Sequence, residues 1–131
     1  MQFPKELKYS KSHEYLKTLP NNQAIIGITA YASNELGDVV FVELPEIGKA
    51  YKAGDKFGVI ESVKSVSDLY IPIDGKITEV NKDLSDHPEY INQDPYGKGW
   101  MLKVEMISDP NKSKELISSE EYGKFVLAEA H

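Results

Sequence analysis

Short β-prone runs alternate with turn residues along most of the chain, and this pattern restricts the fold more than any other feature. The runs at residues 23–28, 38–44, 59–71, 76–81 and 100–106 are rich in β-branched, aromatic and aliphatic side chains. Clusters of Pro, Asn, Asp and Gly separate them. Many short strands at such spacing predict a mainly β fold, either a small sandwich or a flattened barrel.

The run at residues 38–44 carries the strongest β signal, and Pro45 ends it. Along this strand we expect Val39, Phe41 and Leu44 to alternate against Val40, Val42 and Glu43.

Two helices are predicted beside the strands. Thr29 can cap a short helix over residues 31–36, and Gly37 suits its end. Ser118 and Glu121 stand at capping-box spacing before a helix at the end of the chain. One face of that terminal helix would carry Tyr122, Phe125 and Val126.

Composition narrows the classes of protein and partner. At 131 residues the chain predicts one domain, residues 1–131. The net charge of −6 and the complete lack of arginine argue against nucleic acid as a partner. The apolar runs are too short to span a bilayer, so no membrane partner is expected.

Compartment is predicted from cysteine usage and from the first residues. There is no cysteine, which fits a reducing compartment. Residues 1–6 resemble neither a secretory signal nor an arginine-rich transit segment. We therefore expect a bacterial cytoplasmic protein or, alternatively, the mature form of a mitochondrial matrix protein.

A search for catalytic motifs finds little. His13, His87 and His131 are scattered, and residues 13–17 lack the second histidine of a zinc-protease helix. Neither a phosphate-binding glycine loop nor a nucleophile elbow is present. The sequence therefore predicts a carrier of chemistry rather than an enzyme, with no metal site.

Lys64 lies between two β-prone runs among the small residues Ser62, Ser65 and Ser67. A reachable amine on a rigid hairpin is well suited to hold a covalent arm. Most lysines, however, are simply solvated surface residues. Local turn rules do not place Lys64 at a hairpin tip either, because Val63-Lys64 is not a primed-turn dipeptide.

The wider sequence around Lys64 resembles the glycine cleavage system H-protein family. Residues 61–64 and 66–70 resemble the family's lipoyl-attachment segment. Further matching motifs lie at residues 12–14, 27–29, 36–45, 94–97 and 99–100, and at single positions such as Gly48, Pro72, Gly75, Pro88 and Asn92. The resemblance extends from about residue 7 to residue 125, and the combination is specific although no single motif is.

The resemblance implies a flattened barrel of two antiparallel sheets with short helices. It also implies lipoate joined by an amide bond to Lys64. The arm would accept an aminomethyl group from the pyridoxal-phosphate glycine decarboxylase and pass it to the tetrahydrofolate-dependent aminomethyltransferase. The FAD-dependent dihydrolipoyl dehydrogenase would reoxidise the arm, and a lipoate ligase or a lipoyl or octanoyl transferase would attach it. A monomer with transient contacts is expected.

Family matching also suggests site residues. Ser12, Glu14 and Asp68 match positions that line the groove where the loaded arm rests, and a carboxylate there could pair with the aminomethyl ammonium. Each is equally well explained as a polar residue at a strand end. Glu61 matches too, for hairpin positioning or recognition by the ligase.

Two departures from the family pattern are visible. Tyr15 stands where the family commonly has Trp, which should keep an aromatic contact and add a hydroxyl. Ala30 stands where Asp is usual, which removes an acceptor near the short helix.

Three other interpretations remain at this point. The first is another swinging-arm carrier, although biotin domains usually have methionines beside their lysine and the lipoyl domains of oxo-acid dehydrogenases usually have Asp-Lys-Ala. An H-like protein that relays lipoate to other lipoyl domains needs the same lysine. A cofactor-free β-sandwich interaction module needs no modified lysine at all.

Overall fold

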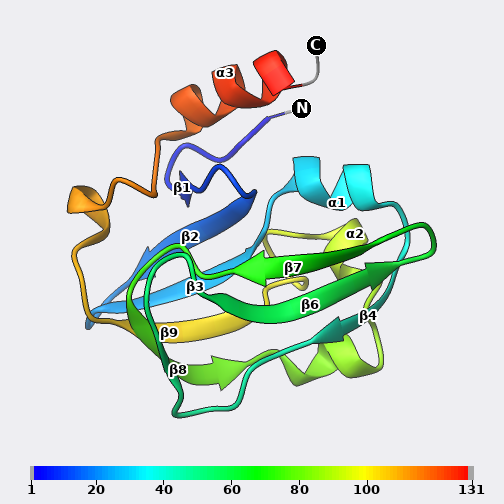
Figure 1. Ribbon diagram of the computed structural model, residues 1–131, viewed down its shortest axis with the longest axis horizontal. Coiled ribbons are helices and arrows are strands. Elements are labelled where there is room, and N and C mark those ends of the chain that lie inside the picture. The colour runs from blue at the N-terminus through cyan, green and yellow to red at the C-terminus, as the bar shows by residue number, and fades with distance from the viewer. Residues whose placement is uncertain (1, 130–131) are drawn as a thin grey trace.

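The computed structural model describes residues 2–129 and consists of two antiparallel sheets with short helices at their edges (Figure 1). The larger sheet has the strand order β1-β2-β3-β9-β8-β5, and the smaller has the order β4-β6-β7. This confirms the predicted mainly β architecture of two antiparallel sheets.

The strands are β1 (Lys8–Tyr9), β2 (Glu14–Leu19), β3 (Gln23–Ile28), β4 (Val39–Glu43), β5 (Ala50–Tyr51), β6 (Lys56–Ser62), β7 (Val66–Tyr70), β8 (Gly75–Val80) and β9 (Leu102–Met106). The helices are α1 (Ala30–Leu36), α2 (Tyr90–Gln93) and α3 (Ser119–Glu129), with 3₁₀ turns η1 (Lys82–Ser85) and η2 (Pro110–Lys112). Within residues 2–129, no helix is long and apolar enough to cross a membrane.

The main core lies between the two sheets. Ile60 of β6 and Leu69 of β7 are almost completely buried, and they belong to the same apolar cluster as Ile26 and Ile28 of β3. The three-stranded sheet is therefore held on the larger sheet by its inward-facing side chains.

A second, aromatic cluster joins the two ends of the described chain. Tyr9 of β1 and Tyr122 of α3 are fully buried, and their rings stack with centroids 4.7 Å apart. Phe3 packs edge-on against both rings. Helix α3 and the N-terminal segment accordingly lie together on one side of the larger sheet (Figure 1).

The helix ends form as predicted. The Thr29 side chain accepts a hydrogen bond from the Ala32 amide, and Gly37 ends α1 with a φ of 75°. Ser118 and Glu121 cap α3 reciprocally: each side chain accepts from the other residue's amide.

The predicted alternation in β4 is wrong. Val39 and Val42 are the buried residues, whereas Phe41 is 51% exposed. The pairing of β4 with β6 shifts register between Val39 and Phe41, which is a β-bulge. The extra residue reverses the alternation beyond the bulge, because side chains switch faces with each residue of a strand.

The turn between β6 and β7 closes without a glycine. The Ser62 amide donates to the Ser65 carbonyl at 2.8 Å, and Ser62 Oγ accepts from the amides of Lys64 and Ser65. None of residues 63–65 has a positive φ. Hydrogen bonds to a serine side chain thus stabilise a tight turn at a place where local turn rules expect Asn-Gly or Asp-Gly.

We predict that Leu69→Ala lowers the free energy of unfolding by about 2–5 kcal/mol, because it removes a side chain buried between the sheets. Val66→Ala, on the same strand but 65% exposed, should change it by less than about 0.5 kcal/mol. Urea unfolding followed by Trp100 fluorescence measures both changes. Equal losses in the two variants would contradict this description of the core.

Candidate functional site

A groove of about 260 Å³ lies where α1 faces the smaller sheet. One part of its lining is apolar and comes from the core side chains Ile28, Leu36, Ile60 and Leu69. The other part is polar and includes Ser12, His13, Glu14, Glu35, Asp68 and Glu129. The groove therefore offers an apolar floor that ends among carboxylates.

Lys64 stands on the turn between β6 and β7 and is exposed to solvent. Its side chain lies across the end of α1, because a Cβ placed on Gly37 would be 3.4 Å from Lys64 Cε. The residue before Gly37 is Leu36, which lines the groove. The lysine stem thus begins beside the α1 side of the groove.

Three of the residues suggested by family matching lie in this one groove: Ser12, Glu14 and Asp68. Glu61 lies elsewhere. It is half-buried on β6, where it pairs with Phe41 of β4 and Val66 of β7. The functional roles given to these residues remain predictions.

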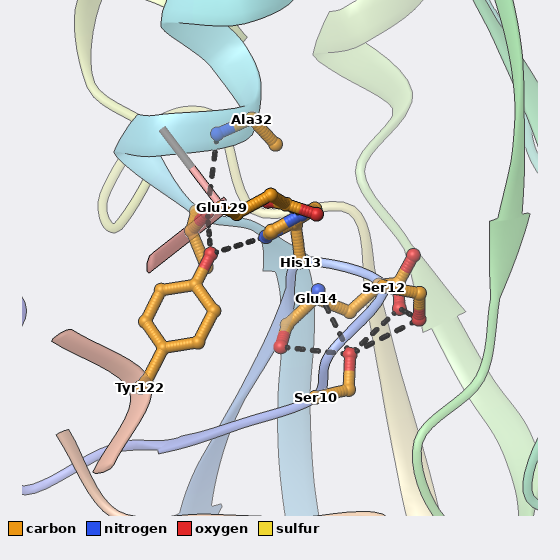
Figure 2. A network of polar contacts seen from close by, with 8 residues as sticks. Ser10, Ser12, His13, Glu14, Ala32, Tyr122 and Glu129 are labelled. Carbon is orange, nitrogen blue, oxygen red and sulfur yellow. Dashed lines mark hydrogen bonds and ion pairs between the residues drawn. The ribbon is translucent and has the colours of Figure 1, made fainter. Parts of the chain in front are cut away.

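Glu14 is a buried carboxyl group, with only 1% of the residue exposed. Ser10 Oγ donates to its Oε1 at 2.8 Å, and Ser12 Oγ contacts the same oxygen. The amide of Tyr70, on the other sheet, donates to Oε2 at 3.3 Å. Figure 2 shows the two serines gathered around Glu14.

Burial raises the pKa of Glu14 from its ordinary 4.5 to about 7, and the donors from Ser12, Ser10 and Tyr70 oppose that rise only in part. The carboxyl group therefore keeps its proton at a pH where an ordinary glutamate is fully ionised. A cation placed beside it would favour the ionised form.

Asp68 lies on the exposed side of the groove. Its carboxylate pairs with Lys56 Nζ at 3.2 Å across the β6–β7 hairpin. Glu14 and Asp68 thus differ: Glu14 is desolvated and held by neutral donors, whereas Asp68 is solvated and already paired.

His13 occupies the polar end of the groove and was not predicted there. Its φ is 76°, and its Nε2 lies 3.0 Å from Glu129 Oε2 at the end of α3. Burial lowers its pKa, and Glu129 partly offsets that effect. Of the other two histidines, His87 pairs with Glu89 and His131 lies outside the described residues.

Sequence reasoning also missed Tyr31, Glu35 and Glu129. Tyr31 and Glu35 are four residues apart on α1, so they share a helix face, and this spacing could have paired them. Glu129 carries no local signal, because only the packing of α3 brings it to the groove.

The two departures from the family pattern are accommodated locally. The buried Tyr15 ring packs against Tyr96, and its hydroxyl donates to the Pro95 carbonyl at 2.7 Å. The Ala30 amide donates to the Tyr96 hydroxyl at 3.0 Å, while Thr29 caps α1.

The residues present fit a long, mostly apolar group attached to Lys64. The amine is reachable, and the adjacent groove is lined by aliphatic side chains and by acceptors suited to a cation. A carboxyl group with a raised pKa in that lining can change its charge with what the groove holds.

Comparisons with known proteins agree over nearly the whole chain. Residues 7–129 match the family model for the glycine cleavage H-protein. The glycine cleavage system H protein of Staphylococcus epidermidis is 56% identical over 126 residues, which is 96% of this chain and 98% of that protein. That of Carboxydothermus hydrogenoformans is 53% identical, over 96% and 95% of the two chains.

A solved structure supports the same assignment. The crystal structure of a glycine cleavage system H protein from Mycobacterium marinum superposes with a TM-score of 0.86 at 38% identity, covering 93% of this chain and 97% of that one. Fold and matches together define a carrier component of a multienzyme system rather than an enzyme. The chain belongs to the glycine cleavage H-protein family, and its general role is that of the lipoyl carrier in glycine cleavage.

We predict that the pH dependence of stability distinguishes the wild type from Glu14→Gln. Because the folded protein keeps the Glu14 proton that the unfolded chain releases above pH 4.5, wild-type stability should fall as the pH rises from about 4.5 to 7. This shift corresponds to at most about 3 kcal/mol. The glutamine variant should lack this component.

Urea unfolding at several pH values between 4.5 and 8 measures the difference between the two proteins. His13 titrates in both and largely cancels in the difference. In Glu14→Gln the side-chain amide replaces the carboxyl group beside the Tyr70 N–H. This changes the free energy of unfolding by the same amount at every pH, so it leaves the slope against pH unchanged. Parallel curves for the two proteins would contradict a raised pKa for Glu14.

Proposed function

We propose that this chain, as a single monomeric carrier domain, holds lipoate as an amide on Lys64 and serves as the mobile carrier of glycine cleavage. The observation that carries the proposal is the placement of an exposed lysine on a closed hairpin turn beside a groove of matching chemistry. Membership of the glycine cleavage H-protein family supports it independently.

When bound to Lys64, lipoate would supply a dithiolane able to carry an aminomethyl group between the pyridoxal-phosphate glycine decarboxylase and the tetrahydrofolate-dependent aminomethyltransferase, with the FAD-dependent dihydrolipoyl dehydrogenase as the partner that would reoxidise it. The protein contributes position: tethering raises the local concentration of the reactive end at each docked enzyme.

The groove residues would protect the loaded arm. Its apolar lining accepts a hydrocarbon chain, and Ser12, Glu14 and Asp68 surround the end where an ammonium group would lie. A docked ammonium lowers the pKa of Glu14 and so favours a charge-assisted pair, which is stronger than a neutral hydrogen bond. Exclusion of water by the floor limits loss of the cargo.

Glu61 would act in recognition rather than in the groove. It lies one strand position before the turn, on the hairpin face that also carries the exposed Phe41 and Val66. A lipoate ligase, or a lipoyl or octanoyl transferase, must approach this face to reach Lys64. The cytoplasm is the proposed location of this activity, and the bacterial origin of the relatives reported above supports it.

Lys64→Arg tests the attachment site. We expect the wild-type protein, produced with lipoate and a lipoate ligase, to gain one lipoyl group that peptide mapping assigns to Lys64. Lys64→Arg should gain none, because a guanidinium forms no such amide. Lys56→Arg is the matched control on the same hairpin: it keeps a cation beside Asp68 and should be modified normally.

Glycine-dependent CO₂ exchange with the decarboxylase then distinguishes a role in glycine cleavage from a role in lipoate relay. The lipoylated wild type and Lys56→Arg should support exchange, and Lys64→Arg should not. Full lipoylation without exchange would overturn the cleavage role and leave lipoate relay. An unmodified Lys64 in the presence of active ligase would overturn the carrier proposal and favour a cofactor-free interaction module.

A further inference from the structure

We infer that the Tyr122 hydroxyl of α3 is a positioning group for the groove, because it links both of the groove's walls in one directional chain of hydrogen bonds. The inference deepens the proposed carrier role and rests on it for its effect on a loaded arm. It concerns residues 109 positions apart in the sequence, since Tyr122 contacts His13 directly.

The Tyr122 hydroxyl makes two short contacts. It lies 2.7 Å from His13 Nδ1 and 2.8 Å from Thr29 Oγ1. Thr29 Oγ1 in turn accepts from the Ala32 amide at 3.2 Å, and His13 Nε2 lies 3.0 Å from Glu129 Oε2. Figure 2 shows Tyr122, His13 and Glu129 in this arrangement, with Ala32 at the other end.

The carboxylate of Glu129, at one end of this series of hydrogen bonds, determines the direction of all the others. A carboxylate only accepts, so neutral His13 carries its proton on Nε2 and donates to Glu129. Its Nδ1 must then accept from the Tyr122 O–H. The Tyr122 oxygen is left as the acceptor for the Thr29 hydroxyl, whose own oxygen accepts from the Ala32 amide.

One end of this chain sets the α1 wall. Thr29 is the N-cap of α1, so its side chain fixes where the helix begins. Helix α1 supplies Tyr31, Glu35 and Leu36 to the groove. The Tyr122 hydroxyl therefore restrains the cap on which the placement of that wall depends.

The other end sets the wall that carries the acceptors. His13 stands between Ser12 and Glu14 in the chain, and its φ of 76° lies in the left-handed region that histidine rarely adopts. Two backbone hydrogen bonds of His13, to the Ser10 carbonyl and from the Thr29 amide, hold this conformation together with contacts from the imidazole. Tyr122 and Glu129 provide them from α3, and the Tyr31 ring packs against His13 at a centroid distance of 5.0 Å.

Tyr122 itself is rigidly placed. It is fully buried, and its ring stacks on Tyr9. A phenylalanine at position 122 keeps that stacking and removes only the hydroxyl. Tyr9→Phe is the matched control, because the Tyr9 hydroxyl donates to the Pro4 carbonyl at 2.6 Å in the same cluster and contacts neither wall.

The first test uses the unmodified protein and long-range ¹H–¹⁵N spectra of the imidazoles. Wild type and Tyr9→Phe should show His13 as the Nε2–H tautomer. In Tyr122→Phe, Glu129 still favours that tautomer, but the ¹⁵N resonance of Nδ1 should shift, because Nδ1 no longer has a donor. Glu129→Ala, at an exposed helix end, removes the other partner of the imidazole and should weaken the preference without disturbing the aromatic cluster.

The second test is the carboxyl titration of Glu14, followed by ¹³C NMR in the same proteins. A displaced His13 segment admits water to Glu14, so the titration midpoint in Tyr122→Phe should move down towards the ordinary value, while that in Tyr9→Phe should not. A purely structural role would move both variants equally or neither.

The third test measures the release of the one-carbon unit to water from lipoylated, loaded protein without the aminomethyltransferase. Release from Tyr122→Phe should be about fivefold faster, the factor that one hydrogen bond of about 1 kcal/mol represents. Tyr9→Phe should match the wild type. An unchanged His13 Nδ1 resonance in Tyr122→Phe, or equal effects of the two variants, would overturn the inference.

The proposed function and this inference fail in different ways. If Lys64 takes up no lipoate, the carrier role fails, and the imidazole and carboxyl spectra still decide whether Tyr122 positions the groove. If lipoylation and loading succeed but release is the same in all variants, the carrier role stands and the inferred effect on the loaded arm is wrong.

Discussion

The burial of Ile60 and Leu69 between the sheets is the contact on which the rest of this molecule depends. A β-hairpin by itself is marginally stable in water. Here β6 and β7 bury these inward side chains almost completely on the larger sheet, and β4 pairs along one edge. The hairpin consequently becomes a firm support for Lys64, and its outer residues are left free to face partners.

The groove follows from the way this support is bordered. Helix α1 runs beside the smaller sheet, and the segment before β2 closes the polar end, so core aliphatic residues and surface carboxylates meet in one hollow. Glu14 connects the two sheets there through the Tyr70 amide. A carboxyl group in that position is almost completely withdrawn from water yet lines the groove, and this combination makes its charge responsive to a neighbour.

Local sequence signals predicted the elements that are stabilised locally. Thr29 and Gly37 gave the ends of α1, and Ser118 gave the start of α3, because capping bonds span only a few residues. The Lys64 turn and the β4 bulge escaped such rules: one depends on a serine hydroxyl, and the other on register with β6. The approach of α3 to the groove depends on aromatic packing between distant segments, which no local pattern encodes.

The glycine-free turn at Lys64 has a kinetic consequence. Its backbone is closed by Ser62, so movement of anything attached to Lys64 comes from rotation about side-chain bonds rather than from opening of the loop. Exposed side chains change rotamer within picoseconds to nanoseconds, whereas loops and lids take far longer. A tethered group that is not held in the groove would thus sample its reach many times during a single protein encounter, without any opening of the turn.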